Sequence, residues 1–108
     1  MDDTLTDCEI SALRASAAQA CALLKALANE DRLLLLCQLV VAERNVGELE
    51  TLTGIRQPTL SQQLGVLRRE GLVATRKEGK QVYYRISSPQ ALAVIQTLYQ
   101  LFCAEDAE

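Results

Sequence analysis

The side chains best suited to covalent chemistry in this chain of 108 residues are its 4 cysteines, at positions 8, 21, 37 and 103. They are scattered without any Cys-x-x-Cys spacing, and the chain has no histidine. Zinc sites commonly use such spacing, and the absence of histidine removes both the commonest general base and a leading metal ligand. Because no nucleophile–base pair and no phosphate loop is present either, we expect no enzyme, no bound metal and no cofactor.

The compartment decides whether these thiols stay reduced. The N-terminal sequence MDDTLTDCEI is acidic and lacks the positive region and apolar run of a secretory signal. No stretch approaches the ~18 consecutive apolar residues that a membrane helix needs. We therefore expect a cytoplasmic protein without membrane contact, in which stable disulfides are rare. The length, together with 49% hydrophobic residues, predicts one globular domain over residues 1–108.

Positive charge is concentrated in one continuous segment. Of the 11 Lys and Arg residues, 7 lie between positions 56 and 85, together with 2 of the 14 acidic residues, so the segment carries +5. The rest of the chain holds 4 basic and 12 acidic residues, or −8, and the two parts sum to the net charge of −3. Such a run can be a solvated surface, but it also suits a segment that contacts phosphate inside an otherwise acidic protein.

Hydrophobic periodicity predicts long helices near both ends of the chain. The first spans about 9–28, and a second begins after Asn29 as its N-cap and contains the string LLLLCQL. Four consecutive leucines cover every side of a helix, so we expect this second helix to be buried nearly all round, with help from a second subunit. A last helix spans about 89–103, with apolar positions at Leu92, Ile95, Leu98 and Phe102.

Between them, two short helices are joined by a turn. Residues 46–53 form the first, which Gly54 ends. The second spans about 58–70, with Pro58 at its first position and Gln57 as its cap. One of its sides is an apolar stripe and the opposite side is polar, which is the pattern of a helix-turn-helix whose second helix reads DNA. The stripe consists of Leu60, Leu64 and Leu67.

A β-rich segment over about 72–86 follows, with Glu78-Gly79-Lys80 as the turn of a hairpin. Short polar side chains early in the reading helix can hydrogen-bond base edges in the major groove, and basic side chains on the hairpin can reach phosphate or the minor groove. The fold class we expect is therefore mainly α with a small β-hairpin, a winged helix-turn-helix. The predicted DNA-binding residues are Gln57, Thr59, Ser61, Gln62, Gln63, Arg76, Lys77 and Lys80.

Several segments match a known family pattern: Leu27-Ala28-Asn29, Arg32-Leu33, Val46-Gly47-Glu48-Leu49, the block QPTLSQQLGVLRREGLV that starts at Gln57, and Tyr84. Through these segments the chain resembles the ArsR/SmtB family of small bacterial repressors over nearly its whole length. The family commonly has histidine where this chain has Gln63. The resemblance implies a homodimer whose interface is formed by the helices over about 9–28 and 89–103. It also implies repression of transcription, through double-stranded operator DNA, until an effector arrives.

The resemblance also bears on the effector. Cys37 in LLLLCQL and Cys103 in LFCAE resemble the thiol pair of the persulfide-sensing branch, the BigR/SqrR type of sulfide-responsive repressor. In that branch a reactive sulfur species joins two cysteines through a disulfide or polysulfide bridge, and the repressor leaves its operator. The resemblance thus implies that Cys37 and Cys103 are redox-sensing residues. Cys21, at the edge of an apolar helix face, has the pattern of a small hydrophobe, and Cys8 lies in an acidic segment expected to be a tail.

The order in which the two thiols react stays open at this point. Cys103 is predicted at a helix C-terminus beside Glu105 and Asp106, and both features disfavour a thiolate. This favours Cys37 as the first nucleophile, unless burial suppresses its ionisation more strongly.

Two other functions remain open. Metal-sensing members of the family use closely spaced cysteines on the helix matching residues 46–53, or histidine and acidic pairs on the last helix, and this chain has neither. A metalloid-responsive repressor of the same fold, using Cys37, Cys103 and Cys8, is compatible with the sequence. The acidic total charge also fits a protein-interaction module that uses its winged helix to bind protein.

Overall fold

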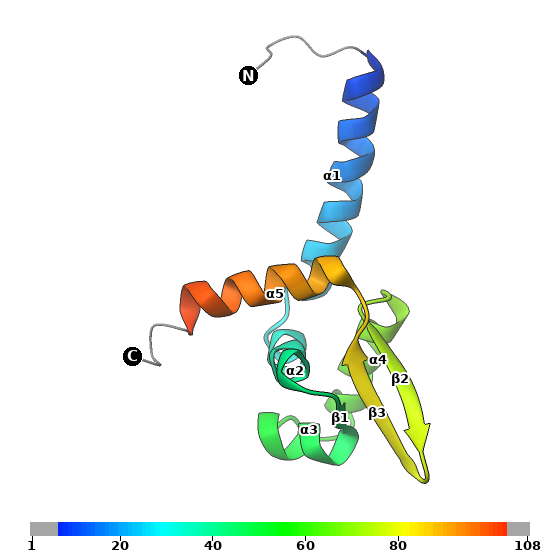
Figure 1. Ribbon diagram of the computed structural model, residues 1–108, viewed down its shortest axis with the longest axis vertical. Helices are drawn as coiled ribbons and strands as arrows, with labels where there is room; N and C mark the ends of the chain where they lie inside the picture. The colour runs from blue at the N-terminus through cyan, green and yellow to red at the C-terminus, as the bar shows by residue number, and fades with distance from the viewer. Residues whose placement is uncertain (1–6, 104–108) are drawn as a thin grey trace.

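The computed structural model describes residues 7–103, which form a mostly helical body with a small antiparallel sheet (Figure 1). The fold class expected from the sequence, mainly α with a β-hairpin, is confirmed. The elements in chain order are α1 (Asp7–Leu27), α2 (Glu30–Val41), β1 (Arg44–Asn45), α3 (Val46–Thr53), α4 (Thr59–Arg69), β2 (Val73–Glu78), β3 (Gln81–Ile86) and α5 (Pro89–Phe102).

Helix α2 lies at the centre and contacts α1, α3, α4, α5 and β3. Its N-terminus is capped as predicted, because the Asn29 side chain accepts a hydrogen bond from the backbone N–H of Arg32 at 3.0 Å. In the single chain α2 is not covered all round, since Leu34 is 48% and Val41 70% exposed, and their burial by a second subunit stays a prediction. Neighbouring helices cover only part of its circumference. The fully covered face consists of Leu35, Leu36 and Leu39.

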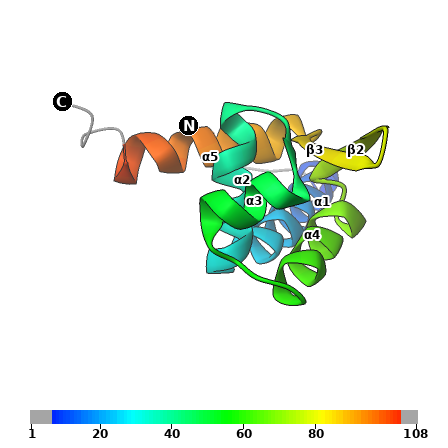
Figure 2. The ribbon, with the colours of Figure 1, turned by 90° about the horizontal axis from the view of Figure 1, so that it is seen from below.

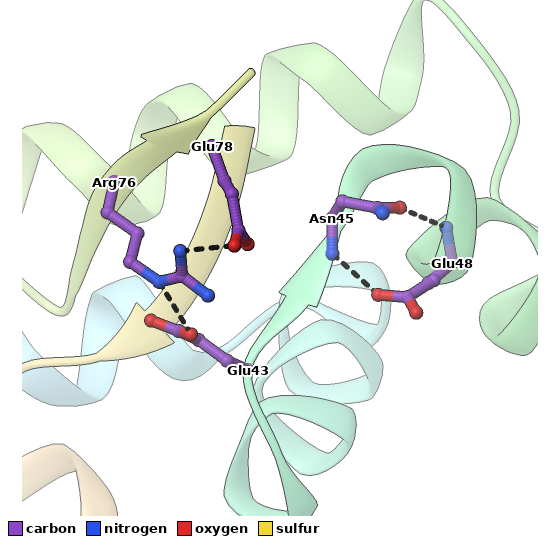
Figure 3. Close-up of polar contacts among 5 residues, drawn as sticks. All are labelled: Glu43, Asn45, Glu48, Arg76 and Glu78. Carbon is purple, nitrogen blue, oxygen red and sulfur yellow. Dashed lines mark hydrogen bonds and ion pairs between the residues drawn. The ribbon is translucent and has the colours of Figure 1, made fainter. Parts of the chain in front are cut away.

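Helices α3 and α4 form the helix-turn-helix. Asn45 and Glu48 make a reciprocal capping box at the start of α3, with hydrogen bonds of 2.8 and 2.9 Å (Figure 3). Gly54 ends α3 in the left-handed conformation, with φ of +76°. Helix α4 begins at Thr59, one residue later than predicted, with Pro58 in the cap position. The backbone N–H of Ser61 donates to the Gln57 side chain, and the backbone N–H of Gln62 donates to the carbonyl oxygen of Pro58, which places Pro58 just before the helix.

The sheet has three strands in the order β1-β3-β2, all antiparallel. The hairpin β2–β3 matches the predicted segment, and Gly79 takes a positive φ of +62° in its turn. The two-residue strand β1 pairs Arg44 with Tyr84 and Asn45 with Tyr83, and the sequence analysis missed it. This pairing fastens the hairpin to the connection between α2 and α3.

The two terminal helices leave the body in different directions. Helix α1 projects away from the core, and α5 crosses over α2 (Figure 1). Residues 9–22 of α1 are exposed, and the helix contributes Ala26 and Leu27 at its C-terminal end to the core. Phe102, near the end of α5, is 72% exposed. Within residues 7–103, no helix combines the length and hydropathy required to cross a membrane.

Candidate functional site: a reading helix, a basic hairpin and a thiol pair

Helix α4 is held by its apolar side and presents its polar side outward. Leu60, Leu64 and Leu67 are buried to within about 1% of their surface, so the helix sits rigidly on the core. Ser61 and Gln62 are exposed, while Thr59 and Gln63 are half-buried at the edges of the contact. In Figure 2, α4 lies at the periphery of the body near the hairpin. The amphipathic reading helix that the sequence predicts is thus present.

Two of the predicted base-reading amides already have partners inside the protein. The Gln57 Oε1 accepts a hydrogen bond from the backbone N–H of Ser61 at 3.0 Å. The Gln63 Oε1 accepts one from Arg32 Nη1 at 2.8 Å. The sequence singled out Arg32 only as a residue that matches the family pattern. The structure adds that its side chain contacts the reading helix. Arg32 lies three residues after a helix cap, from which its side chain reaches α4.

Arg32 also reaches the end of α1. Its Nε donates to the carbonyl oxygen of Ala26 at 2.6 Å, and its Nη2 donates to that of Lys25 at 3.3 Å. A cation at a helix C-terminus is favoured by the unpaired carbonyls there. One guanidinium therefore joins the last turn of α1 to the reading helix.

On the hairpin, Arg76 differs from Lys77 and Lys80, the other two predicted phosphate contacts, because its guanidinium is already paired within the protein. The Arg76 Nε donates to Glu43 Oε1 at 2.8 Å and its Nη1 donates to Glu78 Oε1 at 3.2 Å (Figure 3). The guanidinium carbon also lies 4.6 Å from the centre of the Tyr83 ring. The hydrogen bond to Glu43 is the largest of the causes that raise the pKa of Arg76. Lys77 and Lys80 are exposed.

Glu43 is the functional residue that sequence reasoning missed here. It lies between α2 and β1, and its ion pair ties the hairpin to the end of α2. Only the unpredicted strand β1 brings this carboxylate beside the hairpin, so no local sequence signal reveals it.

The second site is where α2 and α5 pack against each other. Cys37 is half-buried against the hydrophobic core, Cys103 is exposed just after the last turn of α5, and both are free thiols. Burial raises the pKa of the Cys37 thiol, and the negative charge of an ionised Cys103 raises it further. Cys37 lies on α2 and Cys103 caps the C-terminus of α5, so the two cysteines belong to helices that pack against each other.

The other two cysteines belong to α1. Cys21 is an exposed free thiol on α1. Cys8 belongs to the first turn of α1, and its side chain lies outside the described part, as do Glu105 and Asp106. Within residues 7–103, no group of three or more His, Cys, Asp or Glu side chains has the arrangement of a metal site.

Comparison with known proteins bears on both sites. The model of a family described as bacterial regulatory protein, arsR family, matches residues 29–75, which run from the cap of α2 into β2. A biofilm growth-associated repressor of Agrobacterium fabrum is 50% identical over 97 residues, covering 90% of this chain and 83% of that protein. The transcriptional activator HlyU of Vibrio cholerae is 49% identical, covering 82% of each.

Solved structures agree with these relatives. The transcriptional repressor BigR from Xylella fastidiosa superposes with a TM-score of 0.80 at 48% identity, covering 87% of this chain and 96% of that one. A homodimeric winged helix-turn-helix DNA-binding domain from Mycobacterium bovis superposes with a TM-score of 0.69 at 34% identity, covering 99% and 94%. The winged helix-turn-helix expected from the sequence is thereby confirmed, and the similar proteins are transcriptional regulators that bind DNA.

Proposed function

This chain belongs to the arsR family of bacterial regulatory proteins, and from that premise we propose a homodimeric repressor that leaves its operator when sulfur bridges Cys37 and Cys103. That it is a DNA-binding regulator of transcription, not an enzyme, follows from the family. The sulfur response is our proposal. The observation that carries it is the packing of α2, which contains the free thiol Cys37, against α5, whose C-terminal cap is the free thiol Cys103.

The apolar surface of the terminal helices supports the dimer. Leu13 and Leu24 on α1 and Tyr99, Leu101 and Phe102 on α5 are all at least half exposed in the single chain. A similar domain from Mycobacterium bovis is homodimeric. We place the interface on α1 and α5, which leaves α4 and the hairpin of each subunit for DNA. A twofold dimer reads two half-sites about one DNA turn apart, roughly 34–36 Å.

The proposed chemistry needs a low-molecular-weight persulfide, R–S–S–H, as the oxidant. One cysteine thiolate attacks its outer sulfur, the S–S bond breaks, and the donor leaves as R–S⁻ while the protein carries –S–S–H. The second thiolate then attacks the Sγ of the first cysteine, the bond from that Sγ to the outer sulfur breaks, and hydrosulfide leaves. Two thiols are oxidised to a disulfide, and the persulfide is reduced to a thiol and hydrosulfide. If each cysteine first takes up one sulfur from its own donor molecule, attack of one protein persulfide on the other with loss of one hydrosulfide leaves a trisulfide bridge.

The structure favours Cys103 as the first nucleophile, contrary to the gentle sequence argument for Cys37. Cys103 is exposed to a dissolved donor. Cys37 is half-buried, and burial raises its pKa, so less of it is thiolate at neutral pH. Cys37 is then the thiol that closes the bridge.

A bridge between Cys37 and Cys103 would change the position of the reading helix α4 through the packing of α2 and α5. It would hold α2 and α5 at a fixed separation, while α5 also forms the dimer contact and α2 contacts α4. A shift of α5 against α2 therefore changes the spacing of the two α4 helices. Allosteric couplings of about 1–3 kcal/mol are typical, so we expect operator affinity to fall by roughly 5- to 150-fold.

The test is operator release by glutathione persulfide, measured by gel shift on the DNA upstream of the gene and by intact mass. Reduced wild type should bind and then release with its two thiols bridged. Cys37→Ser and Cys103→Ser should bind and stay bound, whereas Cys21→Ser, which removes an exposed thiol elsewhere, should behave as wild type. Normal release by both single variants would refute the proposal.

The same thiols could hold a thiophilic metalloid, which is the alternative function. Two neighbouring free thiols are the observation that favours it. Arsenite and glutathione persulfide, added in parallel to the same reduced protein, separate the two. Release by arsenite alone would replace the sulfur proposal with the metalloid one.

A further inference from the structure

The side-chain amide of Gln63 is held in one orientation by its hydrogen bond with Arg32. Its partner, Arg32 Nη1, lies 2.8 Å from Gln63 Oε1. A guanidinium has five N–H donors and no acceptor, so only the oxygen end of the amide can face it. A flipped amide would place two donors against each other and lose a charge-assisted hydrogen bond. The oxygen of Gln63 therefore points to Arg32.

The other end of this amide is available to a ligand. Among the described residues, no hydrogen bond uses Gln63 Nε2, and no side-chain nitrogen or oxygen is both buried and unpartnered. The NH₂ group therefore reaches solvent at the edge of α4. With its acceptor occupied, Gln63 can offer a ligand donors only.

Gln62, the next residue, contrasts with this. It is exposed, and its side chain has no hydrogen bond within residues 7–103. Its amide can turn freely and present both a donor and an acceptor, as the bidentate contact of glutamine with adenine requires. Two chemically identical side chains on one helix thus differ in what they can read.

We propose that Arg32 makes Gln63 a donor-only reader, which selects a hydrogen-bond acceptor on a base edge in the major groove, such as O6 or N7 of guanine. This inference rests on the DNA-binding part of the proposed function and is independent of the sulfur response. Gln63 lies in the second turn of α4, beside the exposed Gln62, where a reading helix approaches base edges rather than the backbone. Arg32 is a positioning residue, since its guanidinium is committed to Gln63 and to the end of α1.

Arg32 makes this orientation durable, unlike the similar hydrogen bond at Gln57. The Gln57 oxygen accepts from a backbone N–H at an exposed site, where water competes. The bond from Arg32 is part-buried and charge-assisted, and the same guanidinium is fixed at two further carbonyl oxygens. Contact with DNA therefore leaves the Gln63 oxygen facing inward.

The test is a selection from a randomised duplex library with the fully reduced protein, read by sequencing, for wild type, Gln63→Glu and Gln62→Glu. Glutamate at position 63 keeps a bond to Arg32 but presents an oxygen outward. The wild type should prefer an acceptor-bearing base at one position of each half-site. In Gln63→Glu that preference should be lost or move to a base with a donor, such as cytosine, with roughly 5- to 150-fold weaker binding to the wild-type sequence. Gln62→Glu should alter a different position.

Arg32→Met adds a test from the opposite direction. It frees the Gln63 amide to turn and to make the bidentate contact with adenine, so the preference at the same base pair should shift from guanine toward adenine. Melting temperature and circular dichroism check that the variant folds. The Gln63→Glu result stands without it if the variant fails to fold. Unchanged base preferences in Gln63→Glu would overturn the proposal, and so would a loss equal for all sequences, which indicates a phosphate contact. No selection by the wild type would instead count against DNA binding itself.

Discussion

The functional side chains are held in opposite ways in two regions. One is the reading head, formed by α4 and the hairpin β2–β3, and the other is the thiol pair Cys37 and Cys103. On α4 and the hairpin, Gln57, Gln63 and Arg76 are each hydrogen-bonded within the protein before any DNA arrives. At the junction of α2 and α5, both cysteines are free thiols, and one is exposed. Preorganisation suits recognition, because it lowers the entropy lost on binding. A thiol that must react with a small donor and then with a second thiol benefits instead from being free and accessible.

The largest expected effect is on the free energy of unfolding, and it should differ between a core residue under the reading helix and an exposed residue at the end of α5. Leu60 is completely buried beneath the reading helix, so Leu60→Ala should lower the free energy of unfolding by about 2–5 kcal/mol. Phe102→Ala, at the exposed end of α5, removes a side chain that touches little of its own subunit and should act mainly on dimer formation. Urea unfolding and sedimentation distinguish these effects. Equal losses of unfolding free energy would mean that both regions rest on the same core.

Within the reading head, an exposed amide should matter more for sequence than for general affinity. Gln62→Ala should weaken binding to the specific operator by about 1–3 kcal/mol if its amide contacts a base edge. Fluorescence anisotropy on operator and random duplexes measures both affinities. Lys80→Ala, on the hairpin turn, is the matched control, since it should weaken both duplexes alike and flatten the salt dependence by about one unit of slope. An equal loss from Gln62→Ala on both duplexes would contradict its assignment.

The rate at which the thiol pair closes its bridge should depend on pH, because Cys37 is a free and partly buried thiol. Burial raises the pKa of Cys37, so below that pKa its thiolate fraction grows about tenfold per pH unit. Bridge closure by Cys37 should therefore speed up as the pH rises from about 7 to 9, as followed by acid quench and intact mass after a persulfide pulse. Cys37→Ser should accumulate the persulfide on Cys103 without closing. A closure rate that does not change over this range would contradict attack by the Cys37 thiolate as the closing step.

The sequence predicted the elements better than the contacts between them. Periodic leucines, Asn29 and Gly54 act within one turn of helix, so the helix-turn-helix and its boundaries were readable to within a residue or two. Strand β1 has only two residues, too few to show a period, and the partners of Gln63 and Arg76 come from 31 and 33 positions away. The exposure of Leu34 in the single chain was not readable either, because an apolar string records hydrophobicity but not whether a neighbouring element or a second subunit covers it.

The smallest expected effect concerns Arg76, whose preorganisation has a different meaning from that of Gln63. Its donors face two carboxylates, so DNA phosphate must compete with Glu43 and Glu78 for the same guanidinium (Figure 3). Surface ion pairs stabilise proteins little, so Glu43→Gln should leave unfolding nearly unchanged.

In binding, Glu43→Gln should strengthen affinity for all duplexes slightly and steepen the salt dependence by up to about one unit of slope, because Arg76 is freer to release a counterion. Glu48→Gln is the matched control, because its carboxylate serves a helix cap and not the hairpin. Salt titrations of both variants measure the difference. Weaker binding by Glu43→Gln alone would show that the ion pair positions the hairpin for DNA, which would make Arg76 a preorganised group in the same sense as Gln63.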